Sequence, residues 1–169
     1  MFPIGLGLGV RKHTMLSSIS ELSIIDKIRI CSLSASLGDV RLWSHYADGH
    51  RGVAIEIDFD GRESEIHKVD YINQLKEFSN TILTGPRSED VLRLKTNHWE
   101  YEEEFRIISD VEYFSIKGML SAVYCGIRIS DLHQELLLRS VSNRIPVFST
   151  KLNEKTVTIE PQKQLNSTT

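Results

Sequence analysis

The sequence of 169 residues has few of the features that mark several common protein classes. Its two cysteines are too few for a disulfide framework or for a four-cysteine zinc site. Lysine and arginine number 20 against 23 aspartates and glutamates, and the net charge of −3 argues against general nucleic-acid binding. With 40% hydrophobic and 25% charged residues, the composition is that of an ordinary globular protein.

Long hydrophobic runs are also absent. No apolar stretch approaches the roughly 18 residues that a membrane span needs, so no membrane association is expected. Near the N-terminus, the charges of Arg11 and Lys12 follow an apolar stretch, whereas a secretory signal carries its charges first. We therefore expect a cytoplasmic protein with reduced thiols. The glycines of this stretch lack the rest of a phosphate-binding fingerprint, which favours a flexible segment over residues 1–18.

The apolar pattern predicts a single α+β domain over residues 19–160, with a mixed, mainly antiparallel sheet and inserted helices. The polar residues 161–169 are expected to form a flexible tail. Strands are predicted over residues 28–33, 52–59, 67–71, 101–108, 122–129, 145–148 and 156–159. Helices are predicted over residues 19–27, 39–47 and 72–82, from Ser88 toward Trp99, and after Ser130.

For two of these helices, the sequence also predicts specific side-chain contacts. Asp39 is placed to cap the helix over 39–47, since aspartate is a preferred residue at that position. In the helix after Ser130, we expect an ion pair between Glu135 and Arg139, which are four residues apart. The same helix is expected to point three leucines inward, namely Leu132, Leu136 and Leu137.

The first informative stretch precedes the hydrophobic strand that begins near Gly52. It gathers Trp43, Ser44, His45, Tyr46 and His50. A polar and aromatic cluster at the mouth of a strand is typical of a ligand site. The two histidines are five residues apart, which is not the spacing of a helical zinc pair, so no metal site is expected. Packing with satisfied hydrogen bonds explains the same residues equally well.

The second informative stretch runs from Trp99 to Ile108. If it is extended, Glu102, Glu104 and Arg106 share one face, with about 7 Å between successive positions. Such a row can hold sugar hydroxyls, and either glutamate can act as a general base or stabilise a developing cation. A cross-strand salt bridge and a solvated acidic run are the two structural alternatives.

Together the two stretches resemble a large prokaryotic family that is catalogued as domain of unknown function 2971. Its members typically read W-S-H-Y-A-x-x-H-x-G and later W-x-Y-E-x-E-x-R-I, which correspond here to residues 43–52 and 99–107. The outer parts fit Cys31–Ser34 and Val123–Gly126, so the resemblance covers about residues 28 to 150. More loosely, the chain also resembles abortive-infection proteins that protect bacteria from phage.

The sequence departs from this family at its start. Members usually begin with a further segment that holds a Y-x-Y-like strand and an N-D-P-F-[DE]-like motif, and neither is found here. We therefore expect the chain to be N-terminally truncated relative to the family. The expected loss of a strand from the site favours binding over catalysis.

The order of the elements also resembles ADP-ribosyltransferase-like folds, in which a late glutamate binds the nicotinamide ribose. This resemblance implies NAD as the cofactor, Glu104 or Glu102 as catalytic residue, Tyr46 stacked on nicotinamide and His45 orienting the ribose. Ligand-binding roles would then fall to four further residues, Ser44, His50, Arg106 and Trp43.

Two functions remain open, and both require the two stretches to converge on one site. The first is a nucleotide- or partner-binding module with a role in phage defence, whose partner is a small molecule or a protein. The alternative is an NAD-dependent ADP-ribosyltransferase-like or NAD-degrading enzyme. A third possibility is that both stretches are signatures of the fold and form no functional site. We rank this possibility and the binding module together above the enzyme, because the expected opening segment is absent.

Overall fold

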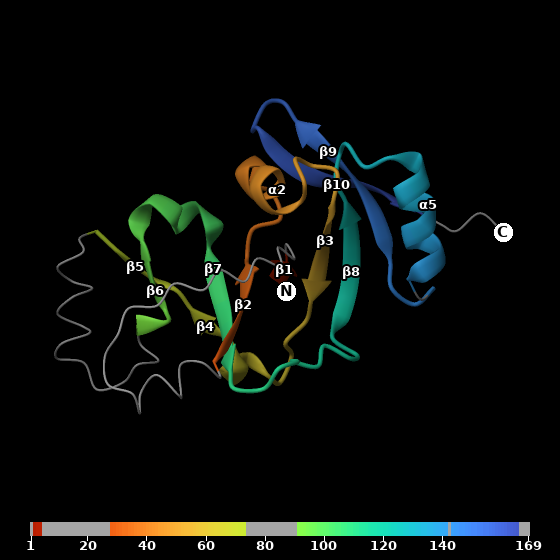
Figure 1. Ribbon diagram of the computed structural model, residues 1–169. Helices are drawn as coiled ribbons and strands as arrows, with labels where there is room; N and C mark the ends of the chain where they lie inside the picture. The colour runs from red at the N-terminus through yellow and green to blue at the C-terminus, as the bar shows by residue number, and fades with distance from the viewer. Residues whose placement is uncertain (1, 5–27, 74–90, 142, 166–169) are drawn as a thin grey trace. The chain divides into compact units, whose positions relative to one another are not determined.

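The computed structural model describes residues 2–4, 28–73, 91–141 and 143–165 (Figure 1). The chain divides into two compact units, and each is described by itself. Unit 1 comprises Met1–Gly7, Leu33–Gly61 and Ile116–Thr169, and unit 2 comprises Leu8–Ser32 and Arg62–Ser115. The range expected to form a single domain, residues 19–160, therefore includes parts of both units.

Unit 1 contains a five-stranded sheet with the order β1-β3-β8-β9-β10. The β8–β9 pair is parallel and the other three pairs are antiparallel. This mixed, mainly antiparallel sheet, combined with helices, confirms the predicted α+β class. The strands are β1 (Phe2–Ile4), β3 (Val53–Ile57), β8 (Leu120–Cys125), β9 (Val147–Asn153) and β10 (Thr158–Leu165).

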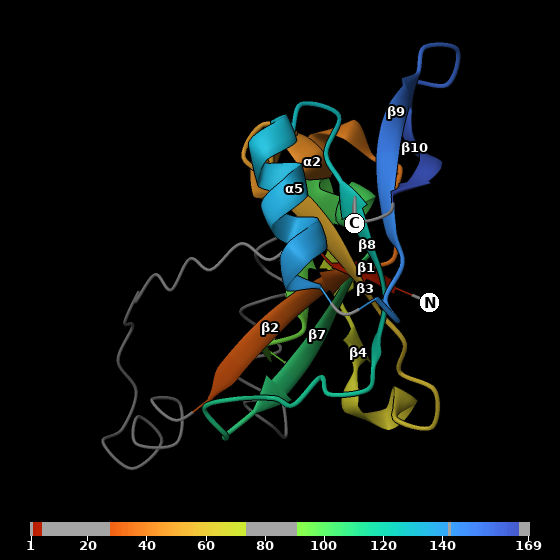
Figure 2. The ribbon, with the colours of Figure 1, turned by 90° about the vertical axis from the view of Figure 1, so that its right-hand side faces the viewer.

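Two helices cover opposite faces of this sheet (Figures 1 and 2). Helix α2 (Val40–Tyr46) buries Trp43 in a cluster that includes Tyr124 of β8. Helix α5 (Asp131–Ser140) packs from the other side, where Cys125 belongs to a second cluster. Tyr124 and Cys125 are neighbours on β8, and consecutive strand residues point to opposite faces of a sheet.

The predicted start of α2 is confirmed. The Asp39 carboxylate accepts a hydrogen bond of 2.8 Å from the backbone N–H of Arg41, so it caps the helix as expected. After the helix, the loop passes so close to Gly126 that a Cβ there would lie 2.2 Å from the carbonyl oxygen of His50. Only glycine fits this position.

Unit 2 contains a three-stranded sheet with the order β2-β7-β4 and a parallel pair, β5–β6. The boundary between the units follows Ser32, which lies inside β2. The strands are β2 (Arg29–Ser34), β4 (His67–Lys68), β5 (Asp70–Ile72), β6 (Leu94–Thr96) and β7 (Glu104–Ser109). Two short 3-10 helices, η1 (Glu63–Glu65) and η2 (Asn97–Glu102), complete the described part of the unit.

Several predicted elements differ from the structure in unit 2. The helix expected to run from Ser88 toward Trp99 is wrong at residues 94–96, which form β6 because they pair with β5. The strand expected over 101–108 begins only at Glu104, after η2. The helix predicted over 19–27 and most of the one over 72–82 lie outside the described residues.

Two further differences fall in unit 1. Leu132 and Leu136 are 63% and 51% exposed, so the prediction that they point inward is wrong. The buried face of α5 is offset from them, because Leu137 and Leu138 make its contacts with the sheet. Residues 161–165, expected to start the flexible tail, belong to β10, where Pro161 sits at a register shift that tolerates proline. Of the flexible segment expected over residues 1–18, the structure describes only β1.

Candidate functional site

The glutamates of the second motif lie in a compact ionic cluster of unit 2. We call Lys95, Glu102, Glu104 and Arg106 the ionic cluster. The Lys95 ammonium donates to Glu102 and, at 2.7 Å, to Glu104. The Arg106 guanidinium donates to the other oxygen of Glu104 at 2.8 Å. Glu102 and Glu104 are only 4% and 3% exposed, so two buried carboxylates face two cations.

The backbone brings these side chains together in a way that differs from the expected strand. Glu102 ends η2, and Glu103 takes a left-handed conformation with φ 44° before β7 begins. Lys95 reaches both carboxylates from β6. The grouping of Glu102, Glu104 and Arg106 was visible in the sequence, but the partner Lys95 was not, because it depends on the β5–β6 pairing.

The electrostatics of the cluster favour the charged forms. Burial alone would raise the pKa of Glu104, but hydrogen bonds from Arg106, Lys95 and Ser32 outweigh it and hold this pKa below its ordinary value. Burial would likewise lower the pKa of Lys95, and its hydrogen bonds to the two glutamates raise it instead. Tyr71 borders the cluster, where its hydroxyl oxygen accepts a 2.9 Å bond from the backbone N–H of Glu104.

The first motif lies in unit 1, on and just after α2. Trp43 is 3% exposed, and its indole N–H donates 2.7 Å to the carbonyl of Leu37, so this side chain is a core anchor. Ser44, His45 and Tyr46 occupy the exposed side of the helix. The rings of His45 and Tyr46 meet edge to face with centroids 6.1 Å apart.

His50 is held by its backbone rather than by its side chain. Its φ is 69°, and its N–H donates 3.1 Å to the carbonyl of Trp43. The imidazole Nδ1 is buried without a hydrogen-bond partner. Burial and the nearby Arg128 charge lower the pKa of His50, which favours the neutral ring.

The two predicted motifs therefore belong to different units. His45 and Tyr46 lie in unit 1, and Glu104 and Arg106 lie in unit 2. Within unit 2 the structure brings together Glu102, Glu104 and Arg106. The convergence of the two motifs on one site stays a prediction.

A second buried carboxylate, missed by the sequence analysis, lies in unit 1. Glu56 on β3 is 7% exposed, and its two oxygens accept hydrogen bonds of 2.7 Å from Ser121 and 2.6 Å from Tyr124. Burial and the neighbouring Glu56 raise the pKa of Tyr124 to about 12. A strand was expected over residues 52–59 without a role for Glu56, and the Glu56 side of the sheet carries the Trp43 cluster.

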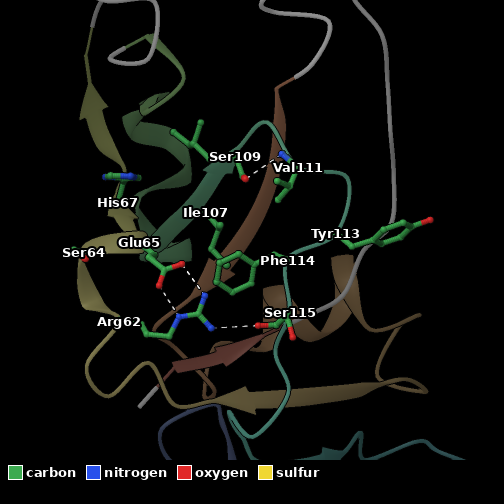
Figure 3. A pocket seen from close by; sticks show the side chains of 11 residues that line it. Arg62, Ser64, Glu65, His67, Ile107, Ser109, Val111, Tyr113, Phe114 and Ser115 are labelled. Atoms are coloured by element: carbon green, nitrogen blue, oxygen red, sulfur yellow. Dashed lines mark hydrogen bonds and ion pairs between the residues drawn. The ribbon is translucent and has the colours of Figure 1, made fainter.

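Unit 2 also contains a pocket of about 450 Å³, which the sequence analysis did not foresee (Figure 3). Its lining combines an ion pair between Arg62 and Glu65 with the apolar side chains of Ile107 and Phe114. Hydroxyl groups come from Ser64, Ser109 and Ser115. The pocket volume falls in the range of about 300–1,000 Å³ that is typical of small-molecule sites.

Among the described residues, no group of three or more histidine, cysteine, aspartate or glutamate side chains is placed to hold a metal ion. In that same part of the chain, no helix is both long and apolar enough to cross a membrane. Comparisons with protein-family models, curated proteins and solved structures find no match.

Proposed function

We propose that this chain is a binding module that holds a small, nucleotide-sized ligand in the pocket of unit 2. The observation that carries the proposal is the pocket itself, because it combines apolar surface with a guanidinium and several hydroxyls in one recess. Ligand pockets typically combine apolar surface with a few polar groups that fix orientation, and this lining contains both kinds of group.

The ionic cluster supports binding rather than catalysis. A carboxylate that stabilises a developing cation must face the substrate, whereas Glu102 and Glu104 are buried and face Lys95. Removing one partner from a buried ion pair leaves an uncompensated charge, so the two carboxylates depend on Lys95 and Arg106 staying in place. The cluster is therefore best explained as a structural clamp that joins β6, η2 and β7.

In the alternative function, an NAD-dependent ADP-ribosyltransferase-like or NAD-degrading enzyme, Glu104 has a catalytic role. In that function Glu104 would contact the nicotinamide ribose, and its present bonds to Lys95 and Arg106 would have to open. An assay of nicotinamide release from NAD⁺ separates the two functions. The binding module predicts no release by the purified chain, and release that Glu104→Gln abolishes would favour the enzyme.

Blocking the pocket tests the proposed function directly. Val111 lines the pocket and is 51% exposed, so Val111→Trp is expected to fill part of the recess without disturbing the core. Val157 in unit 1 is 58% exposed and gives the matched control, Val157→Trp. By calorimetry, Val111→Trp should weaken binding of adenosine 5′-monophosphate about tenfold or more, which corresponds to about 1.4 kcal/mol. Equal effects of both variants, or no binding by the wild-type chain to any nucleotide or nucleoside tested, would remove the proposal.

The role in phage defence rests on the resemblance of the two motifs to family 2971 and to abortive-infection proteins. If ligand binding serves defence, cells that express the wild-type chain should reduce phage plating more than cells that express Val111→Trp at the same protein level. Equal phage plating on the two strains would show that the pocket has no role in defence.

A further inference from the structure

We infer that the ligand of this pocket is a nucleoside monophosphate, whose phosphoryl group binds Arg62 by displacing the carboxylate of Glu65. This inference rests on the proposed function, since it names the ligand class and the anchoring residue of the same pocket. Glu65 then acts as an internal stand-in for the phosphate.

The ion pair that now occupies Arg62 has the geometry that a phosphate would take. The guanidinium Nε lies 2.5 Å from one oxygen of Glu65, and Nη2 lies 2.7 Å from the other. Two parallel bonds from one guanidinium match two oxygens of a phosphate as well as those of a carboxylate. The carboxylate therefore marks an anion position inside the pocket.

Arg62 is held in place by contacts that do not involve Glu65. Its guanidinium carbon lies 4.6 Å from the centroid of the Phe114 ring, and Nη1 donates 3.3 Å to the carbonyl of Ser115. Figure 3 shows Arg62 between Glu65 and Ser115, beside the Phe114 ring. Both contacts can persist when Glu65 leaves, so the guanidinium is already oriented for an incoming anion.

Glu65 is held less firmly than Arg62. The two side chains are 40% and 38% exposed, and ion pairs at that exposure contribute little stability. Glu65 also belongs to η1, which has three residues and no side-chain cap. The segment follows Gly61, whose φ of 74° sets a turn. We therefore expect a phosphate, which carries more negative charge than one carboxylate, to displace Glu65 from Arg62.

The rest of the pocket suits a planar ring and a sugar. Ile107 and Phe114 supply apolar surface for a base. The Ser109 oxygen accepts a 3.2 Å bond from the N–H of Val111, which leaves its hydroxyl hydrogen to donate to a ligand. Serine hydroxyls at Ser64 and Ser115 add donors and acceptors for ribose.

The test compares three probes by calorimetry on the full chain: adenosine 5′-monophosphate, adenosine and inorganic phosphate. The variants are Glu65→Gln and Arg62→Gln. The matched control is Asp48→Asn, because Asp48 and Arg51 form an exposed pair of the same i, i+3 spacing in unit 1. Melting curves of all variants check that the fold is retained.

The monophosphate should bind more tightly than adenosine or phosphate alone. Glu65→Gln should strengthen monophosphate binding about fivefold and leave adenosine unchanged, because the competing carboxylate charge is gone. Arg62→Gln should weaken monophosphate binding about tenfold, to the level of adenosine. Asp48→Asn should change neither.

Two other results have separate meanings. If adenosine and its monophosphate bind with equal affinity to the wild type and to both pocket variants, the anion site is wrong while the proposed pocket stands. If none of the probes binds any variant, the proposed function fails and the inference fails with it.

Discussion

Each unit of this protein buries a carboxylate on a strand, but the two units neutralise it differently. In unit 2, Glu104 is 3% exposed and is bonded by two cations, Lys95 and Arg106. In unit 1, Glu56 is 7% exposed and is bonded by two hydroxyls, from Ser121 and Tyr124. Glu104 is therefore paired with two cationic side chains, whereas Glu56 accepts hydrogen bonds from two neutral hydroxyl groups.

This difference in bonding partners determines how much stability each site should lose when one partner is removed. Removing one member of a buried ion pair leaves an uncompensated charge, which is among the most destabilising changes in a protein interior. Removing one hydroxyl donor leaves a carboxylate with one fewer hydrogen bond, which is a smaller loss. Both carboxylates are bonded to partners within the protein, and under the proposed function the ligand binds in the pocket of unit 2.

The largest expected effect comes from Glu104→Ala. The variant removes the carboxylate that pairs with Arg106 and leaves Lys95 with Glu102 as its remaining carboxylate partner. We expect the free energy of unfolding to fall by about 3 kcal/mol, measured by urea denaturation. Adding Arg106→Met should recover part of the loss, since it removes one surplus cation. A Glu104→Ala variant as stable as the wild type would show that the cluster is not a clamp.

The free energy of unfolding should depend on acid pH through Glu104 of the ionic cluster. The pKa of Glu104 lies below its ordinary 4.5 in the folded chain, so its contribution is present above pH 4.5 and is lost as the pH falls through the folded pKa. The acid-dependent part of the stability should therefore be smaller in Glu104→Ala than in the wild type.

The stability that the Tyr124–Glu56 hydrogen bond contributes should be lost at alkaline pH. Tyr124 has a pKa of about 12, raised from 10.0, so its contribution is present below pH 10 and is lost as the pH rises toward 12. Tyr124→Phe should remove this alkaline dependence and cost about 1 kcal/mol at neutral pH. Ultraviolet absorbance of tyrosinate during an alkaline titration follows the group. Ionisation of Tyr124 near pH 10 would contradict the account of the Glu56 site.

The smallest effect is expected from an ion pair that neither unit buries. Glu135 and Arg139 pair across one turn of α5, as the sequence predicts, and their side chains are 58% and 72% exposed. Glu135→Gln should therefore lower the free energy of unfolding by only about 0.4 kcal/mol in urea titrations. A loss as large as that of Glu104→Ala would remove the distinction between buried and exposed pairs.

Local signals in the sequence predicted the local parts of the structure. Asp39 caps α2 because a capping side chain acts on its own helix, and the alternation in β3 marks a strand. Pairing between distant segments left no such signal. Residues 94–96 have a helical pattern and yet form β6, because β5 offers them a parallel partner.

The site follows the same rule. Glu102, Glu104 and Arg106 are close in sequence, and the ion pair between Glu104 and Arg106 forms within β7, but Glu102 lies in η2 and not on the expected strand. The burial of the two glutamates was not predicted, because it requires Lys95 to arrive from another strand. The pocket was missed because its walls come from segments about 50 residues apart, joined by the bond between Arg62 and Ser115.

Under the proposed function, the glutamates of the second motif stabilise the fold while the pocket of the same unit binds the ligand. Glu104→Gln tests both roles in one variant with two readouts, the free energy of unfolding and the affinity for adenosine 5′-monophosphate. We expect the free energy of unfolding to fall by about 2 kcal/mol, with an unchanged dissociation constant for the nucleotide. Unchanged stability together with lost nucleotide binding would contradict this expectation.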